Sequence, residues 1–270
     1  KDGNYVIKGS NEIDGELIDT HITVAEGVEA NITFDGARIK NQTKYAVRSQ
    51  MTSIIYNPIV PVMDIFGNSN IYVEADSELM SAAAEENPVI RVTGEMTVKD
   101  SEAVLKLTPG AEESSMGPYL AADKEVICGN VTGTIQPAGS LTVEGGNLDM
   151  TGYIKSIDKF TMTGGTITST CQCDTGMLTA NDIMIIGGIW NQSINTYGVG
   201  KSKLFKAYRT IQVSGGSIRV KWIIATPRDI VAFSSPSTHM IGENLKLGDG
   251  FVLEDTLDAY GNEINLFDLT

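Results

Sequence analysis

One phrase occurs four times between residues 141 and 220: LTVEGGNLDM at 141–150, FTMTGGTITS at 160–169, IMIIGGIWNQ at 183–192 and IQVSGGSIRV at 211–220. Each copy alternates apolar and polar residues, is interrupted by a Gly-Gly pair and then resumes. Apolar residues stand four and two positions before the first glycine and three positions after it, in every copy. Because side chains on a strand alternate between two faces, this register predicts strands with one buried face.

The spacing of the four copies predicts how these strands are arranged. Their first glycines, Gly145, Gly164, Gly187 and Gly215, are 19, 23 and 28 residues apart. Repeats of this length are typical of coils that stack on one another, since a single coil cannot bury its own apolar stripe. The sequence therefore predicts an all-β solenoid in which the glycine pairs allow sharp bends. None of the pairs has the context of a phosphate-binding loop.

Composition limits the classes of function. The chain of 270 residues is 41% hydrophobic and contains 28 glycines and 8 prolines, a profile typical of a folded β protein. A formal net charge of -14 disfavours nucleic acids and anionic membranes as partners. No run approaches the roughly 18 apolar residues of a membrane-spanning helix. Three cysteines, Cys128, Cys171 and Cys173, are too few for a disulfide framework and form no zinc motif, so at most one bridge is expected.

The flanking segments extend the solenoid pattern. Short alternating strands and Gly turns between residues 5 and 39 predict terminal coils that cap the stack. Residues 50–66 are rich in apolar side chains and prolines, which predicts an irregular loop ending in a buried strand at 62–66; a substrate-binding lid is the alternative. Residues 76–86 have a helical composition or form a loop beside the coil. We divide the chain into a β-helix domain at 1–238, which includes the N-terminal cap, and a C-terminal capping segment at 239–270.

A polar column is the candidate site that the register itself defines. The outward position four residues after the first glycine holds Asp149, Thr168, Asn191 and Arg219, which stacked coils would place about 4.8 Å apart. A calcium-dependent lyase would need several carboxylates and a basic residue in one groove, whereas this column has one carboxylate. Three other acids, Asp158, Asp174 and Asp182, are expected in turns, where they would accept hydrogen bonds from the backbone.

Aromatic residues near the last two repeats are candidates for sugar binding. Trp190 and Trp222 have inward parity, which predicts that they belong to the core. Tyr197 and Tyr208 lie in or near a loop, where an exposed ring could stack on the apolar plane of a sugar. The third copy is also apolar at its outward positions Met184 and Ile186, so we expect another part of the chain, or else a partner, to cover them.

The sequence resembles a known family in several stretches: THITVAEGVEANITFDGARI at 20–39, FGNSNIYVEADSELMSA at 66–82, VIRVTGEMTVKDSEAVLKL at 89–107 and the Gly-Gly phrases. These are similar to bacterial secreted β-solenoid surface proteins of the carbohydrate-binding-domain or adhesin-like type. The resemblance implies a single-stranded right-handed parallel β-helix of the pectate-lyase type, usually non-catalytic. The Gly-rich steps of GAGIGG type that often follow the repeats in that family are absent here.

The expected function is therefore a non-catalytic, extracellular or cell-surface module that binds carbohydrate or mediates adhesion through the side of the solenoid. Its partner would be a polysaccharide or host glycan, or alternatively a protein, and its export signal would be processed or omitted. The candidate ligand-binding residues are Tyr197, Tyr208, Asp149, Asn191 and Arg219. No metal site or cofactor is predicted from the motifs.

The alternatives are a calcium-dependent polysaccharide lyase or hydrolase, in which calcium would be the cofactor, and a structural spacer without a ligand. The two histidines, His21 and His239, are far apart, and no GxSxG motif accompanies them.

Overall fold

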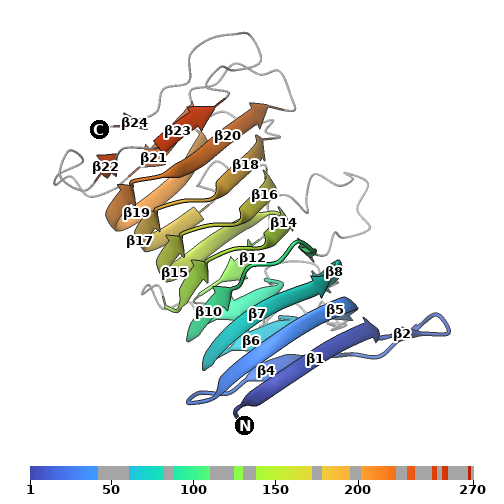
Figure 1. Cartoon of the computed structure of the whole chain (residues 1–270). Helices are drawn as coiled ribbons and strands as arrows, with labels where there is room; N and C mark the ends of the chain where they lie inside the picture. The colour runs from blue at the N-terminus through green and yellow to red at the C-terminus, as the bar shows by residue number, and fades with distance from the viewer. Residues whose placement is uncertain are drawn as a thin grey trace, which may run out of the picture.

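The computed structural model describes residues 1–41, 61–81, 88–109, 125–129, 138–171, 178–194, 202–222, 230–234, 245–247, 251–254 and 267–268. These residues form strands and turns and contain no helix. Their strands pair in parallel, except for a short antiparallel hairpin of β2 (Glu12–Ile13) and β3 (Glu16–Leu17). The fold is a parallel β-helix, as the repeated phrase predicts (Figure 1).

The coils share three faces, and each face is a ladder of parallel strands. Face 1 contains β4 (Ile22–Val24), β6 (Met63–Ile65), β9 (Ile90–Val92), β12 (Glu125–Cys128), β21 (Ile230–Ser234), β24 (Phe267–Asp268) and the first parts of β15 (Tyr153–Met162), β17 (Leu178–Ile185) and β19 (Ser202–Val213). Face 2 contains β1 (Gly3–Ser10), the first part of β5 (Glu29–Asn41), β7 (Asn68–Ala75), β10 (Glu95–Val98), β13 (Ser140–Val143), β22 (Leu245–Leu247) and the later parts of β15, β17 and β19. Face 3 contains the end of β5, β8 (Ser77–Ser81), β11 (Val104–Thr108), β14 (Asn147–Thr151), β16 (Thr166–Cys171), β18 (Ile189–Ile194), β20 (Gly216–Trp222) and β23 (Phe251–Glu254).

The four repeated phrases stack in register, as predicted. On face 2, Leu141, Phe160, Ile183 and Ile211 occupy one column, and all four are buried. The last described strands, β22, β23 and β24, pair in parallel with β19, β20 and β21. These parts of segment 239–270 therefore continue the three faces by further strands.

The glycine pairs lie where the chain turns from face 2 to face 3, and the two glycines of a pair have different constraints. In the second copy, Gly165 has a φ of +75°, a backbone conformation that disfavours a side chain. Its partner Gly164 has no room for one, because a Cβ there would lie 2.4 Å from the carbonyl oxygen of Glu144 in the preceding coil. The pair thus combines a sharp bend with close stacking of consecutive coils.

Trp190 is at the centre of the core, as its inward parity predicts. Its ring packs edge-on against Phe160, with centroids 5.8 Å apart, and against Phe205, at 4.9 Å. Its indole Nε1 donates a hydrogen bond to Oε1 of the buried Gln192 at 3.0 Å, and Gln192 Nε2 donates to the carbonyl oxygen of Ser169. The polar groups of Trp190 and Gln192 are therefore hydrogen-bonded, which offsets the cost of burying them. The side chain of Trp222 lies outside the described part of the chain.

Several local predictions have clear outcomes. The buried strand predicted at 62–66 is confirmed for Met63–Ile65, which form β6 and are all buried, but it is wrong for Phe66, which follows the strand and is 38% exposed. The helix or loop predicted at 76–86 is wrong for Ser77–Ser81, which form β8 with alternate residues buried. The prediction that another part of the chain covers the outer face of the third repeat is also wrong for Ile186, which is 45% exposed. The apolar loop at 50–60, Cys173 and the side chains of Cys128 and Cys171 lie outside the described residues.

Candidate functional site

The predicted polar column exists on face 3, and it is longer than the repeats suggest. Asp149, Thr168, Asn191 and Arg219 follow one another in register on β14, β16, β18 and β20. Toward the N-terminus the same column continues through Lys106, Glu78 and Arg38. Of Arg219 only the backbone is described.

Opposite charges face each other along the N-terminal half of this column. Glu78 Oε1 lies 3.1 Å from Lys106 Nζ, and Glu78 Oε2 lies 3.4 Å from Arg38 Nη2. Partial burial would raise the pKa of Glu78, but the hydrogen bonds from Lys106 and Thr108 and the charge of Arg38 together hold that pKa below its ordinary value. Arg38, Glu78 and Lys106 thus form an ion-pair ladder between coils.

The predicted tyrosines are not part of this column. Tyr208 lies on β19 between faces 1 and 2, is 43% exposed and has Lys206 Nζ 5.3 Å from its ring centroid. Tyr197 lies outside the described residues. The structure therefore brings Asp149, Asn191 and the backbone of Arg219 into one column, and it places Tyr208 on a different ladder.

The acids predicted to lie in turns have another role. Asp158 and Asp182 belong to β15 and β17, and both accept hydrogen bonds from Arg209, at 3.0 and 2.6 Å. Asn181 Nδ2 also donates to Asp158, at 2.7 Å. These acids therefore pair with side chains of neighbouring coils, so the predicted role as acceptors for turn backbone is wrong for them. Asp174 lies outside the described residues.

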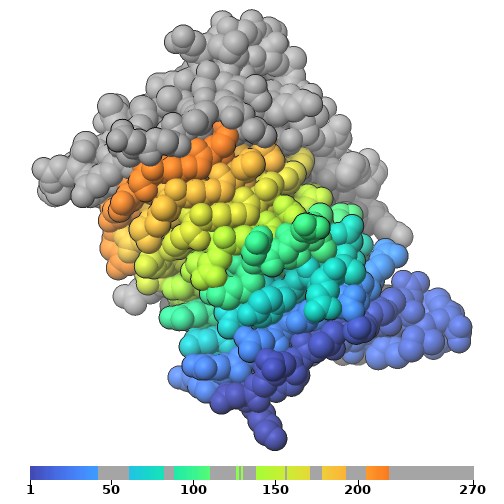
Figure 2. Space-filling model, in the orientation of Figure 1, coloured from blue at the N-terminus to red at the C-terminus, as the bar shows by residue number. Residues whose placement is uncertain are grey.

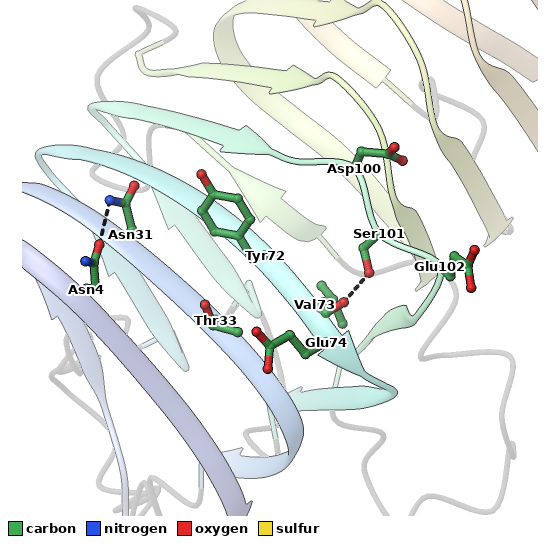
Figure 3. Close-up of a pocket in the computed structure, with 9 residues that line it drawn as sticks. All are labelled: Asn4, Asn31, Thr33, Tyr72, Val73, Glu74, Asp100, Ser101 and Glu102. Carbon is green, nitrogen blue, oxygen red and sulfur yellow. Dashed lines mark hydrogen bonds between the residues drawn. The ribbon is translucent and has the colours of Figure 1, made fainter.

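A groove on the outer surface of face 2 collects the features of a binding site that the column lacks. It has a volume of about 450 Å³ and is open to solvent (Figure 3). Its walls come from β1, β5, β7 and the turn after β10. The residues that line it are Asn4, Asn31, Thr33, Tyr72, Val73, Glu74, Asp100, Ser101 and Glu102.

An asparagine ladder runs beside this groove, and two of its three members, Asn4 and Asn31, line it. Asn4, Asn31 and Asn70 are in register on β1, β5 and β7. Asn70 Nδ2 donates to Asn31 Oδ1, and Asn31 Nδ2 donates to Asn4 Oδ1, both at 2.8 Å. Because each amide orients the next, the ladder presents the amide nitrogen of Asn4 at its N-terminal end in a fixed position.

Tyr72 supplies an aromatic surface beside the ladder. It points outward from β7 two residues after Asn70 and is 37% exposed. The opposite wall is held in place by Ser101, whose hydroxyl donates to the carbonyl oxygen of Val73, and by the backbone bond from Lys99 to Ile71. Glu74, Asp100 and Glu102 add three carboxylates to the lining, and no described side chain forms an ion pair with them. Tyr72, Asn4, Asn31 and Glu74 thus lie together on the outer surface of one sheet, whereas the carboxylates of Asp100 and Glu102 point away from the ring of Tyr72 (Figure 3).

Sequence reasoning missed this groove although a signal exists. The three strands carry Asn4-Tyr5-Val6, Asn31-Ile32-Thr33 and Asn70-Ile71-Tyr72, in which an asparagine and an apolar residue recur at the same register. These phrases lack a glycine pair, so the repeat that defines the later coils does not reveal them.

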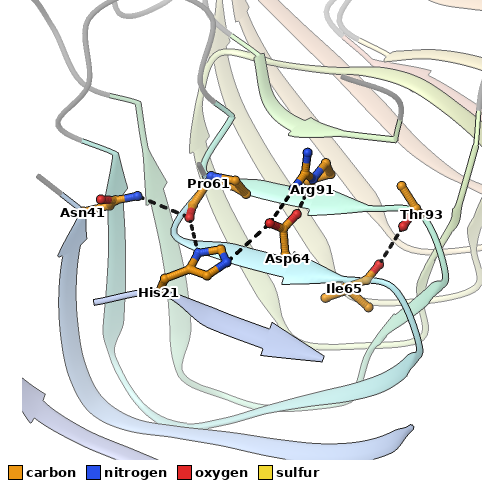
Figure 4. Close-up of polar contacts among 7 residues, drawn as sticks. All are labelled: His21, Asn41, Pro61, Asp64, Ile65, Arg91 and Thr93. Atoms are coloured by element: carbon orange, nitrogen blue, oxygen red, sulfur yellow. Dashed lines mark hydrogen bonds and ion pairs between the residues drawn. The ribbon is translucent and has the colours of Figure 1, made fainter. Parts of the chain in front are cut away.

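A second polar cluster lies on face 1 (Figure 4). The carboxylate of Asp64 is 3% exposed and is bound by Arg91 through Nε and through Nη2, the latter at 2.5 Å. His21 lies beside it, with Nε2 3.4 Å from Asp64 Oδ2 and Nδ1 donating to the carbonyl oxygen of Pro61 at 2.7 Å. The charge of Asp64 on β6 is thereby balanced by Arg91 on β9, and together with His21, which directly precedes β4, the cluster ties three coils together.

The described residues include no cluster suited to a metal ion and no helix suited to a membrane. No group of three or more His, Cys, Asp and Glu side chains among them is placed to hold a metal ion. None of their elements is a helix long and apolar enough to cross a membrane. Comparison with known proteins finds no matching family model, no matching curated protein and no matching solved structure.

Proposed function

We propose that the protein is a non-catalytic carbohydrate-binding module of a cell surface and that its glycan ligand occupies the groove on face 2. The observation that carries this proposal is the exposed ring of Tyr72 beside the hydrogen-bonded ladder of Asn4, Asn31 and Asn70. Sugars have apolar planes that stack on aromatic rings and hydroxyl groups that need oriented amides and carboxylates. The groove offers both kinds of partner within one hollow.

The rigidity of the scaffold supports binding at this place. The lining residues come from paired strands, and the turn after β10 is fastened to β7 by the Ser101 hydrogen bond. Groups that are fixed before a ligand arrives lose little conformational entropy when it binds. The resemblance to secreted solenoid proteins leads to the same class of ligand.

The composition of the lining favours binding over cleavage. A polysaccharide lyase needs a basic residue that removes a proton from the sugar, and the nine lining residues include no Arg, Lys or His. The three carboxylates of the lining also belong to no group of described residues that is placed to hold a metal ion. We therefore rank the calcium-dependent lyase below the binding module.

The test is a pull-down of the full chain with plant, microbial and mucin polysaccharides, with and without calcium. Tyr72→Ala is expected to weaken retention at least about tenfold, because the stacking surface is lost. Tyr208→Ala is the matched control, since it removes a similarly exposed ring from the same stack, and it should bind like the wild type.

The outcomes separate the alternatives. Equal losses in both variants, or a loss in the Tyr208 variant alone, would place the ligand elsewhere on the stack. New unsaturated or reducing ends in the supernatant would favour the lyase or hydrolase. A wild-type chain that binds none of the polysaccharides would refute the proposal.

A further inference from the structure

The groove on face 2 carries a negative charge that its own lining does not balance. The lining contains the carboxylates of Glu74, Asp100 and Glu102 and no Arg, Lys or His. None of these three acids forms an ion pair with another described residue. In the surface view the blue and cyan coils that build the groove lie next to one another as adjacent bands (Figure 2). A hollow lined by one sign of charge concentrates ions of the opposite sign.

Two lysines of the same coils are held by other acids. Lys8 of β1 forms an ion pair with Asp35, and Lys99, which follows β10, has its Nζ 2.7 Å from Glu144 Oε2. The hydrogen bond with Asp35 and the charge of Asp35 raise the pKa of Lys8, and the charge of Glu74 adds a smaller contribution. Lys8 thus pairs with Asp35 rather than with Glu74, so a cationic ligand can approach the carboxylate of Glu74.

Tyr72 and Glu74 are the lining residues best placed to contact a cation. Both are exposed on the outer side of β7, while Val73 between them is buried. In Figure 3 the side chain of Glu74 points toward Thr33, on the same outer surface as the ring of Tyr72. An ammonium group is attracted to the face of an aromatic ring and forms charge-assisted hydrogen bonds with a carboxylate. The two neighbouring side chains therefore provide both kinds of contact for an amine.

We propose that the glycan bound in the groove is built from amino sugars with free, protonated amino groups. This inference rests on the proposed function, because it names the class of sugar that occupies the same groove. A uronic acid would bring its carboxylate close to three acids, on a chain whose net charge is -14, and would be repelled. A neutral or N-acetylated sugar could stack on Tyr72 but would give Glu74 no ion-pair partner. An amino sugar stacks on the ring and also balances the charge of the lining.

The asparagine ladder gives such a sugar a defined orientation. On β7, Asn70 stands two residues before Tyr72 and Glu74 stands two residues after it, so the ladder and the carboxylate lie on opposite sides of the ring. An ammonium group has only donors, whereas a sugar hydroxyl can accept a hydrogen bond from the amide nitrogen of Asn4. The amino group of a sugar stacked on Tyr72 therefore points toward Glu74, and its hydroxyls point toward the ladder.

Calorimetry of the full chain with two oligosaccharides of equal length tests the class of sugar. One is β-linked glucosamine with free amino groups, and the other is its N-acetylated form, which has the same backbone without the positive charge. The wild type should bind the amine form at least about tenfold more tightly at low salt. This preference should shrink between about 0.02 and about 0.5 M salt, since salt screens exposed charges.

Glu74→Gln keeps the size of the side chain and removes its charge. It should reduce the ratio of the two affinities by at least about threefold, because the ammonium group loses its carboxylate partner. Glu95→Gln is the matched control, since it removes the same charge from an exposed position on β10 that does not line the groove. Its ratio of affinities should equal that of the wild type, and circular dichroism checks that both variants are folded.

The outcomes distinguish this inference from the proposed function. Equal affinities for the two oligosaccharides, or equal effects of Glu74→Gln and Glu95→Gln, would overturn the inference. The proposed function would then still stand if other polysaccharides bind and Tyr72→Ala weakens their retention. A lysine peptide of equal charge that binds as tightly as the amine form would identify a basic peptide as the ligand and would also overturn the inference. A wild type that binds neither oligosaccharide and no polysaccharide would refute the proposed function itself.

Discussion

At the scale of single residues, the stack depends on positions where a side chain cannot be accommodated. Gly165 has a φ of +75°, and a Cβ there would lie 2.6 Å from backbone atoms of Gly145 in the preceding coil. Gly9 has nearly the same φ, +73°, but a Cβ there would have no neighbour within 4 Å. A comparison of alanine substitutions at the two glycines therefore separates two free-energy costs, that of the backbone conformation and that of close stacking between coils.

We expect Gly9→Ala to lower the free energy of unfolding by about 1 kcal/mol, the usual cost of a side chain in a left-handed conformation. Gly165→Ala should lower it by about 2 kcal/mol more, because its methyl group also forces two coils apart. Urea denaturation of the two variants measures both values. Equal losses would mean that the coils relax around Gly165 and that stacking is not tight there.

At the scale of the elements, the ladder on face 3 predicts a dependence of stability on pH. The pKa of Glu78 is below its ordinary value of 4.5 in the folded protein. A carboxyl group with a lowered pKa stabilises the fold while it is ionised, so its contribution is present above the unfolded pKa and is lost as pH falls through the folded pKa. Acid should therefore remove the link between β5, β8 and β11 that Glu78 provides.

Glu78→Gln should lower the free energy of unfolding by about 1 kcal/mol near neutral pH and by almost nothing at a pH below the lowered pKa, since the wild-type carboxyl is then protonated as well. Urea unfolding at both pH values provides the measurement. Glu95→Gln removes the same charge from an exposed position on β10 without an ion pair, and it should have little effect at either pH. A loss that persists in acid would show that Glu78 acts through packing.

The elements also show how far the sequence can be interpreted. The later coils were predictable because an apolar register and a glycine pair recur together, so that Leu141, Phe160, Ile183 and Ile211 align by inspection. The strand at Ser77–Ser81 was not predictable, because its Ala- and Glu-rich surroundings favour a helix. In the folded chain the edges of β5 and β11 favour a strand between them instead. The groove was missed because its residues are far apart in the sequence, and only the stacking of consecutive coils brings Asn4, Asn31 and Tyr72 onto one surface.

At the scale of the whole molecule, the solenoid is a one-dimensional stack in which each coil is stabilised by its neighbours. Polar contacts follow this rule on all three faces: the asparagine ladder on face 2, the Glu78 ladder on face 3 and the cluster of Asp64 and Arg91 on face 1 each join consecutive coils. The free energy of such a stack is close to a sum of coil and interface terms. A coil with described neighbours on both sides therefore depends on two interfaces, whereas β1 pairs with one described strand, β5.

This difference predicts how core substitutions act along the axis. Phe160→Ala removes a fully buried ring that packs against Trp190 in an interior coil, and it should lower the free energy of unfolding by about 3–5 kcal/mol. Tyr5→Ala removes an inward-facing ring that is 43% exposed from β1, which pairs with one described strand, and should cost about 1 kcal/mol or less. Urea denaturation compares the two variants. A cost for Tyr5→Ala as large as that for Phe160→Ala would mean that β1 is held as firmly as the interior coils.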